Sequence, residues 1–281
     1  MEFIEALRTN ALIQNALLAG LIASVSCGII GSYVVTRRIT YIAGGVAHCI
    51  LGGMGAARYF QLVHGWTWLQ PLYGAVAASI IAALIIGVVS LRAREREDTV
   101  ISALWAIGMA IGILFITRTP GYYEDLMSYL FGNILLVSRD NLYMIAGLDI
   151  LVVTVGILFY NKFLAICFDE EFARLRGIPV EAYYLLLLCL TALTVVVLTT
   201  VVGLVMVIAL LTLPVAVAGH FAGRLWHIMI LATVISAVLT TVGLAVSYAP
   251  ELPPGATTIA LAGALYLGTV GTKRIIRLGR G

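Results

Sequence analysis

Residues 183–222 read YYLLLLCLTALTVVVLTTVVGLVMVIALLTLPVAVAGHFA, a stretch of 40 residues without Asp, Glu, Lys or Arg. One membrane-crossing helix needs only about 20 apolar residues. We therefore interpret this stretch as two helices joined by a tight turn. The only plausible turn comprises Thr199, Thr200 and Gly203. Pro214 should kink the second helix and free the backbone carbonyl at position 210, which then needs another partner or water.

The composition of the whole 281-residue chain agrees with a lipid environment. Hydrophobic residues make up 62% and charged residues 11%, whereas a soluble domain carries about 25% charged residues. The mean hydropathy is +1.06. A soluble protein of this size has too little interior for so many apolar side chains. The net charge of +3 is too small to favour a nucleic-acid partner. We expect an all-α, multi-pass bundle forming one domain over residues 1–281.

Nine stretches of the chain are long and apolar enough to be read as membrane spans. A further stretch, 126–137, is too short to cross and is expected to be a re-entrant or interfacial helix. The nine predicted spans are 11–36, 42–63, 71–91, 99–117, 141–161, 183–201, 203–222, 226–248 and 258–272.

The Lys and Arg residues between these spans predict the orientation. With the N-terminus outside, 13 of the 17 lie in inner loops or at the C-terminus, and 4 lie outside. Because positive residues concentrate on the cytoplasmic side, we expect the N-terminus outside and the C-terminus inside, which requires an odd number of spans.

Motifs of soluble catalysis are missing from the sequence. No GxxxxGK[ST] loop, GxSxG elbow or HExxH pair occurs, so an enzyme or a self-powered pump is poorly supported. The four cysteines form no CxxC pair and are best interpreted as small buried hydrophobic residues.

The longest inner loop, 161–183, reads NKFLAICFDEEFARLRGIPVEAY. Acidic residues followed by basic ones suit the dipole of a short helix, and Gly177 and Pro179 should end it. Exposed aromatic residues beside charges suggest a docking helix for a cytosolic partner; the alternative is a solvated linker. The residues that we assign to docking are Phe168, Asp169, Glu170, Glu171, Phe172, Arg174 and Gly177, within a loop at about 162–180.

Two ionisable residues fall inside predicted spans, where an ionisable group marks a candidate functional site. His48 lies ten residues past Arg38, or about 15 Å along the helix. Asp149 lies eight residues past Asn141, or about 12 Å from the outer face, so the two could share a depth. Imidazole and carboxylate suit Zn²⁺ or Mn²⁺. The alternatives are a neutral core histidine for His48 and an acid that bonds a neighbouring helix for Asp149.

Glycines surround His48 in the stretch AGGVAHCILGGMG. Gly44, Gly45, Gly52 and Gly53 remove side-chain bulk, which allows close helix packing or a pore-lining wall. Pro214 is a further candidate for the pore or its packing.

Six ordered segments of the chain resemble the zinc/manganese permease family of ABC importers. They cover nearly the whole chain and read RRITYIAGGVAHCILGGMG (37–55), DTVISALWAIGMAIGILFI (98–116), SYLFGNIL (128–135), FDEEFARLRG (168–177), GLVMVIALLTLPVAVAG (203–219) and ELPPGATTIALAGALYL (251–267).

The resemblance implies a type II ABC importer-like permease in a prokaryotic plasma membrane. Two copies would pair in the membrane, each resting its coupling helix on a cytosolic ATPase that uses ATP. An extracytoplasmic binding protein would deliver Zn²⁺ or Mn²⁺, and no cofactor would be bound permanently. Many members carry Asp four residues before the histidine, where this chain has Gly44. The departure removes one carboxylate from the expected ion path.

Two other transporter classes stay open at the level of the sequence. An iron-chelate or cobalamin permease would have a wider cavity without ligands in the membrane. An ion-driven secondary transporter would need no coupling loop. Ligand types alone do not choose among Zn²⁺, Mn²⁺ and Fe²⁺.

Overall fold

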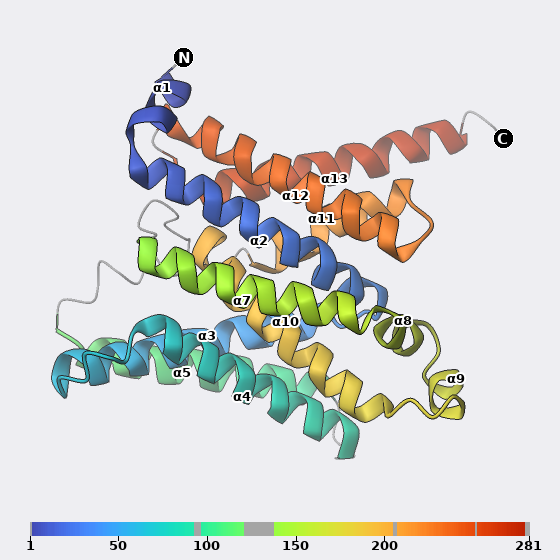
Figure 1. Cartoon of the computed structure of the whole chain (residues 1–281), viewed down its shortest axis with the longest axis horizontal. Coiled ribbons are helices and arrows are strands. Elements are labelled where there is room, and N and C mark those ends of the chain that lie inside the picture. The colour runs from blue at the N-terminus through green and yellow to red at the C-terminus, as the bar shows by residue number, and fades with distance from the viewer. Residues whose placement is uncertain (1, 93–96, 121–137, 205–206, 251, 279–281) are drawn as a thin grey trace.

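The computed structural model describes residues 2–92, 97–120, 138–204, 207–250 and 252–278. All regular secondary structure in these ranges is helical, as expected for an all-α chain. In the labels of Figure 1, the helices are α1 (Glu2–Thr9), α2 (Ala11–Thr36), α3 (Thr40–Val63), α4 (Pro71–Arg92), α5 (Glu97–Arg118), α7 (Arg139–Leu158), α8 (Tyr160–Phe168), α9 (Glu170–Leu175), α10 (Val180–Val202), α11 (Val207–Phe221), α12 (Leu225–Tyr248) and α13 (Pro254–Leu278).

The long helices run side by side, and α2 and α10 occupy the centre of the bundle (Figure 1). In the most apolar stretch of α10, 72% of the residues are buried, and in that of α2 67%, against 22–39% for the other candidate spans. Helices α3, α4 and α5 pack together on one side, and α11, α12 and α13 pack on the other. The two central helices, built from Leu, Val, Ile and small residues, therefore form the core that joins the two groups.

Small residues bring the helices of the first group unusually close together. A Cβ atom added at Gly53 of α3 would lie 2.1 Å from the carbonyl oxygen of Gly74 in α4. One added at Gly108 of α5 would lie 2.7 Å from the Cα atom of Cys49 in α3. Only glycine permits this approach, which is how helices gain van der Waals contact in lipid.

Each of the nine predicted spans contains a helix, but the helices differ in how well they fit a bilayer. Within the described residues, seven are long and apolar enough to cross: α2, α4, α5, α7, α10, α12 and α13. The remaining two are α3, which is long enough at 24 residues, and α11, which has only 15. Because 15 residues span about 22 Å, α11 is shorter than the span expected there, and the number of crossings stays a prediction. The expected short helix at 126–137 lies outside the described residues.

The turn that the sequence predicts within 183–222 lies at Gly203. Of the three residues predicted to form it, Thr199 and Thr200 instead belong to α10, which ends at Val202. Gly203 has φ +82° and donates its backbone N–H to the carbonyl of Thr199 at 3.0 Å. Residues with a Cβ atom rarely adopt this left-handed region, so glycine decides where the first helix stops.

The carbonyl freed by Pro214 has the partner that the sequence requires. Pro214 lies inside α11, so it cannot donate to the carbonyl of Leu210. The thiol of Cys27 in α2 donates to that oxygen at 3.1 Å. This contact fastens α11 to the central helix at the height of the proline.

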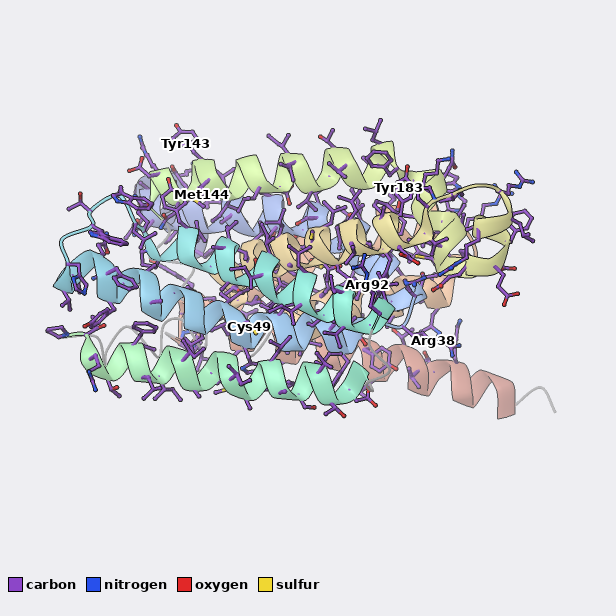
Figure 2. The ribbon with its side chains drawn as sticks, turned by 90° about the horizontal axis from the view of Figure 1, so that it is seen from below. Arg38, Cys49, Arg92, Tyr143, Met144 and Tyr183 are labelled. Carbon is purple, nitrogen blue, oxygen red and sulfur yellow. The ribbon has the colours of Figure 1, made fainter. Side chains whose placement is uncertain are left out.

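Basic residues collect at one end of the bundle. Figure 2 shows Arg38 and Arg92 toward the end that carries α8 and α9, whereas Tyr143 and Met144 lie toward the opposite end. The turns after α2, before α10 and between α11 and α12 also lie at the first end (Figure 1). The arrangement agrees with the charge distribution behind the predicted orientation, which itself remains a prediction.

Candidate ion path and docking segment

His48 lies in α3, a little over two turns from its start at Thr40. Its imidazole is half-buried and stacks on the indole of Trp105 from α5, with ring centroids 4.2 Å apart and planes inclined by 15°. The ring centroid of Tyr41 lies 6.3 Å from that of the same indole. The stack fixes the plane of the imidazole ring and leaves its edge to carry any ligand bond.

The Nδ1 atom of His48 is buried and has no hydrogen-bond partner among the described residues. A core histidine bonded to a helix carbonyl would have such a partner, because leaving a buried polar atom unpaired costs free energy. A ring nitrogen without a partner is free to accept a ligand bond, so this arrangement is compatible with a metal-binding role.

The space beside Gly44 is occupied by apolar side chains. A Cβ atom there would lie 2.7 Å from Cδ1 of Ile208 in α11 and 3.6 Å from Cζ3 of Trp105. A side chain at position 44 would therefore require the end of the Ile208 side chain to shift. The chain lacks that carboxylate and has closed the gap with hydrocarbon.

The other glycines that flank His48 lie in contacts between helices. A Cβ atom added at Gly45 would lie 2.7 Å from Cγ2 of Ile101. One added at Gly52 would lie 2.9 Å from the carbonyl oxygen of Gly108. Like the contact of Gly53 with α4, these are packing contacts. They hold α3 firmly against α5 and α4, so His48 rests on a rigid element.

Asp149 is not brought together with His48. Asp149 is 6% exposed, and its side chain lies against Ser26 of α2, with Cys27 close by. The Oδ1 atom of Asp149 has no hydrogen-bond partner among the described residues. Within the same residues, no group of three or more His, Cys, Asp and Glu side chains could hold a metal ion. Within the described residues of one copy, candidate metal ligands therefore occur singly and not in a cluster. The contact of Asp149 with Ser26 joins α7 to the central helix α2.

The inner loop forms two short helices where the sequence suggested one. Helix α8 ends at Phe168, and the Asp169 side chain caps α9 by accepting the backbone N–H of Phe172 at 2.9 Å. The acidic first turn and basic last turn are present as predicted. Gly177, at φ +72°, follows the end of α9, and Pro179 precedes α10.

The docking segment, which we define as α8, α9 and the residues to Pro179, presents apolar side chains to the outside. Phe168, Phe172 and Leu175 are 69%, 49% and 87% exposed. A groove of about 580 Å³ runs between the two helices. It is lined by Asn161, Lys162, Leu164, Ala165, Phe168, Asp169, Phe172, Ala173, Arg176 and Ile178.

Sequence reasoning missed three residues that define these regions, namely Trp105, Ile208 and Arg37. A tryptophan in the middle of an apolar span is a usable signal, because indole normally lies near the membrane interface. Ile208 carries no signal in an apolar run. Arg37 reads as an ordinary loop cation until its contacts are known.

Comparisons with known proteins concern the family and the fold of the whole chain. The family model described as ABC 3 transport family matches residues 9–273. A "probable metal transport system membrane protein" of Chlamydia trachomatis is 41% identical over 94% of this chain and 89% of the relative. The manganese transport system membrane protein MntC of Halalkalibacterium halodurans is 34% identical over 94% of this chain and 88% of the relative.

A solved structure, PsaBC from Streptococcus pneumoniae in complex with Fab, matches with a TM-score of 0.85 and 26% identity, covering 95% of this chain and 94% of that chain. The match to the family model spans nearly the whole sequence, and the fold agrees along the same length. The chain is therefore a member of the ABC 3 transport family.

Proposed function

We propose that this chain is the membrane permease subunit of an ABC importer that moves a divalent metal ion into the cytoplasm of a prokaryote. The observation that carries the proposal is the half-buried imidazole of His48, which stacks on Trp105 and whose Nδ1 atom has no hydrogen-bond partner among the described residues, in a member of a transport family. Relatives named for manganese transport make Mn²⁺ the first ion to test.

The ion path runs past His48 in this proposal. A transport site must bind its ion weakly enough to release it, and one imidazole per copy meets that requirement. In a complex with two copies of the chain, two imidazoles would be available to the ion. Neutral nitrogen ligands without a carboxylate also suit Zn²⁺ and Fe²⁺, so the ion that the site prefers is decided by experiment.

In this proposal, the docking segment couples transport to ATP hydrolysis by a cytosolic partner. The chain carries no nucleotide-binding loop, so ATP hydrolysis belongs to a cytosolic partner. Exposed Phe168, Phe172 and Leu175 are the apolar contacts that such a partner would cover. An extracytoplasmic binding protein would bring the ion to the opposite face.

The test is metal-dependent ATP hydrolysis by the complete complex, reconstituted in lipid with its ATPase subunit and binding protein. Each of Mn²⁺, Zn²⁺ and Fe²⁺ is supplied in turn, with Mg²⁺ held constant for the nucleotide. We expect one or more of these ions to stimulate hydrolysis, and Ca²⁺ to leave it unchanged because imidazole is a poor ligand for hard cations. Stimulation by an iron chelate or cobalamin alone would identify the other class of importer.

A further inference from the structure

The end of α2 carries an arginine with contacts to three other helices. The guanidinium group of Arg37 donates to the backbone carbonyl of Ile166 in α8 and to Oε1 of Glu170 in α9. It also lies over the ring of Tyr184 in α10, 4.6 Å from the centroid. Arg37 therefore joins the core of the bundle to both helices of the docking segment.

This contact differs from an ordinary surface ion pair, which contributes little. The side chain of Arg37 is only 13% exposed, although that of Glu170 is 44% exposed. The planar guanidinium reaches two acceptors at once, one of them a backbone carbonyl, while its face lies on an aromatic ring. Lysine has neither the fork nor the flat face, so the geometry is specific to arginine.

Neighbouring contacts hold the end of α2 in place beside Arg37. The hydroxyl of Tyr33 donates to the carbonyl of Gly156 in α7 at 3.0 Å. The Tyr33 ring packs edge-on against Phe163 of α8, with centroids 5.2 Å apart. A shift of the docking segment must therefore move the end of α2 or break these contacts.

The chain leads directly from this point to His48. Only Arg37, Arg38 and Ile39 separate α2 from α3, which begins at Thr40. Arg38 has φ +63°, a left-handed conformation that is uncommon outside glycine, and Ile39 is buried. Because the turn is short and Ile39 is buried, the end of α2 and the start of α3 have little freedom to move independently. His48 lies farther along the same continuous helix, α3.

We propose that Arg37 is a positioning residue that transmits movement of the docking segment to the helix carrying His48. Arg37 does not touch the ion, and its role is to keep the turn between α2 and α3 attached to Ile166 and Glu170. The inference rests on the proposed function, because it requires an ATPase that acts on the docking segment.

Hydrogen–deuterium exchange of the reconstituted complex tests the link whichever ion is transported. Exchange is compared with and without a non-hydrolysable ATP analogue in peptides covering 161–178 and 34–42. In the wild-type complex we expect the nucleotide to change exchange in both peptides. In Arg37→Gln, the change should persist in 161–178 and disappear from 34–42. Arg38→Gln is the matched control, since Arg38 is exposed at the next position, and it should behave as wild type.

Glu170→Gln removes the negative charge that pairs with Arg37. Because Glu170 is exposed, this second variant should fold even if Arg37→Gln does not. It should also weaken the response in 34–42. Uptake of metal per ATP hydrolysed should fall in Arg37→Gln by about fivefold or more, the lower range for coupling between sites. Arg37→Lys should recover only part of that loss.

The outcomes separate the two proposals. A nucleotide response in 34–42 that survives both Arg37→Gln and Glu170→Gln would overturn the role of Arg37 and leave the proposed function intact. So would a wild-type response confined to 161–178. No wild-type response in 161–178 would mean that the ATPase does not act through this segment, which overturns the coupling part of the proposed function together with the inference.

Discussion

In the proposed function, His48 is the residue past which the ion moves. Its ring stacks on Trp105 while its Nδ1 atom is unpaired among the described residues. An ionisable residue in an apolar run, such as His48, can be found from the sequence alone. Its stacking partner cannot, because Trp105 comes from another helix and no local pattern links the two.

His48→Ala should lower metal uptake strongly while leaving folding largely intact, because the half-buried imidazole contributes mainly its stack on Trp105 to packing. Uptake must be normalised to folded protein and measured beside thermal stability. His48→Gln, which keeps much of the volume, is the matched control for the stack. If stability falls and normalised uptake stays at the wild-type level, His48 is a core histidine and not a ligand.

Gly44→Asp should destabilise the protein even though it restores a carboxylate. The new Cβ atom would lie 2.7 Å from Cδ1 of Ile208, so the end of that side chain must shift, and the carboxylate would be buried among apolar side chains, which costs free energy unless it is paired. In Gly44→Asp with Ile208→Ala, the loss should be smaller than the sum of the two single losses, because the second change removes the collision. Thermal unfolding of the four proteins checks this cycle, and simple additivity would show that Ile208 does not fill the place of the missing side chain.

Cys167 in α8 should react slowly with alkylating reagents at neutral pH. Burial raises the pKa of its thiol from the usual 9.0 to about 11, despite the opposing effect of Arg37. Since only the thiolate is nucleophilic, the rate should rise about tenfold per pH unit from pH 7 and level off near pH 11. Arg37→Gln removes the cation and should slow the reaction further. Fast labelling at pH 7 would contradict the raised pKa of this partly buried thiol.

At the scale of elements, glycine and proline made the helix ends predictable. Gly203 adopts φ +82° where the long apolar stretch needed a turn, and Gly177 adopts φ +72° where α9 ends. The start of α11 at Val207, directly after residues 205–206 that the structure does not describe, was not predictable, because the sequence around it is apolar. Likewise, the split of the docking segment into α8 and α9 depends on Asp169, whose capping role competes with a continuous helix.

The docking segment should be essential for coupling and dispensable for insertion. Glu170→Lys together with Gly177→Pro should abolish transport. The first change reverses the charge that faces Arg37, and the second forbids the positive φ that follows α9. Metal uptake and ATPase activity are measured on protein that has been quantified in the membrane. Normal transport by this double variant would reduce the segment to a linker.

At the scale of the whole molecule, composition and charge distribution predicted the class of fold well. In lipid the backbone must form helices or a closed barrel, and continuous apolar runs of about 20 residues favour helices, so the all-α bundle could be predicted. The grouping of α3 with α4 and α5 did not, because it depends on glycine contacts between distant segments such as Gly53 and Gly74. For the same reason, the separation of His48 from Asp149 became visible only in three dimensions.

The predicted orientation places the docking segment in the cytosol and residues 249–255 outside. In intact cells, a membrane-impermeant maleimide should label Leu252→Cys and leave Glu170→Cys unlabelled, since both positions are exposed on the protein. Permeabilised cells provide the control for reactivity at position 170. The opposite pattern would reverse the orientation and remove the ATPase from the reach of α8 and α9.

The most direct test of the proposed function is the accumulation of Mn²⁺ in proteoliposomes that contain the permease with its ATPase subunit and binding protein. We predict uptake that requires ATP and both partners, and that falls strongly in His48→Ala. Uptake that proceeds without the ATPase, driven by a proton or sodium gradient, would contradict the proposal and identify a secondary transporter. ATP-driven uptake of iron chelates or cobalamin, without any free divalent metal ion, would contradict the assigned substrate.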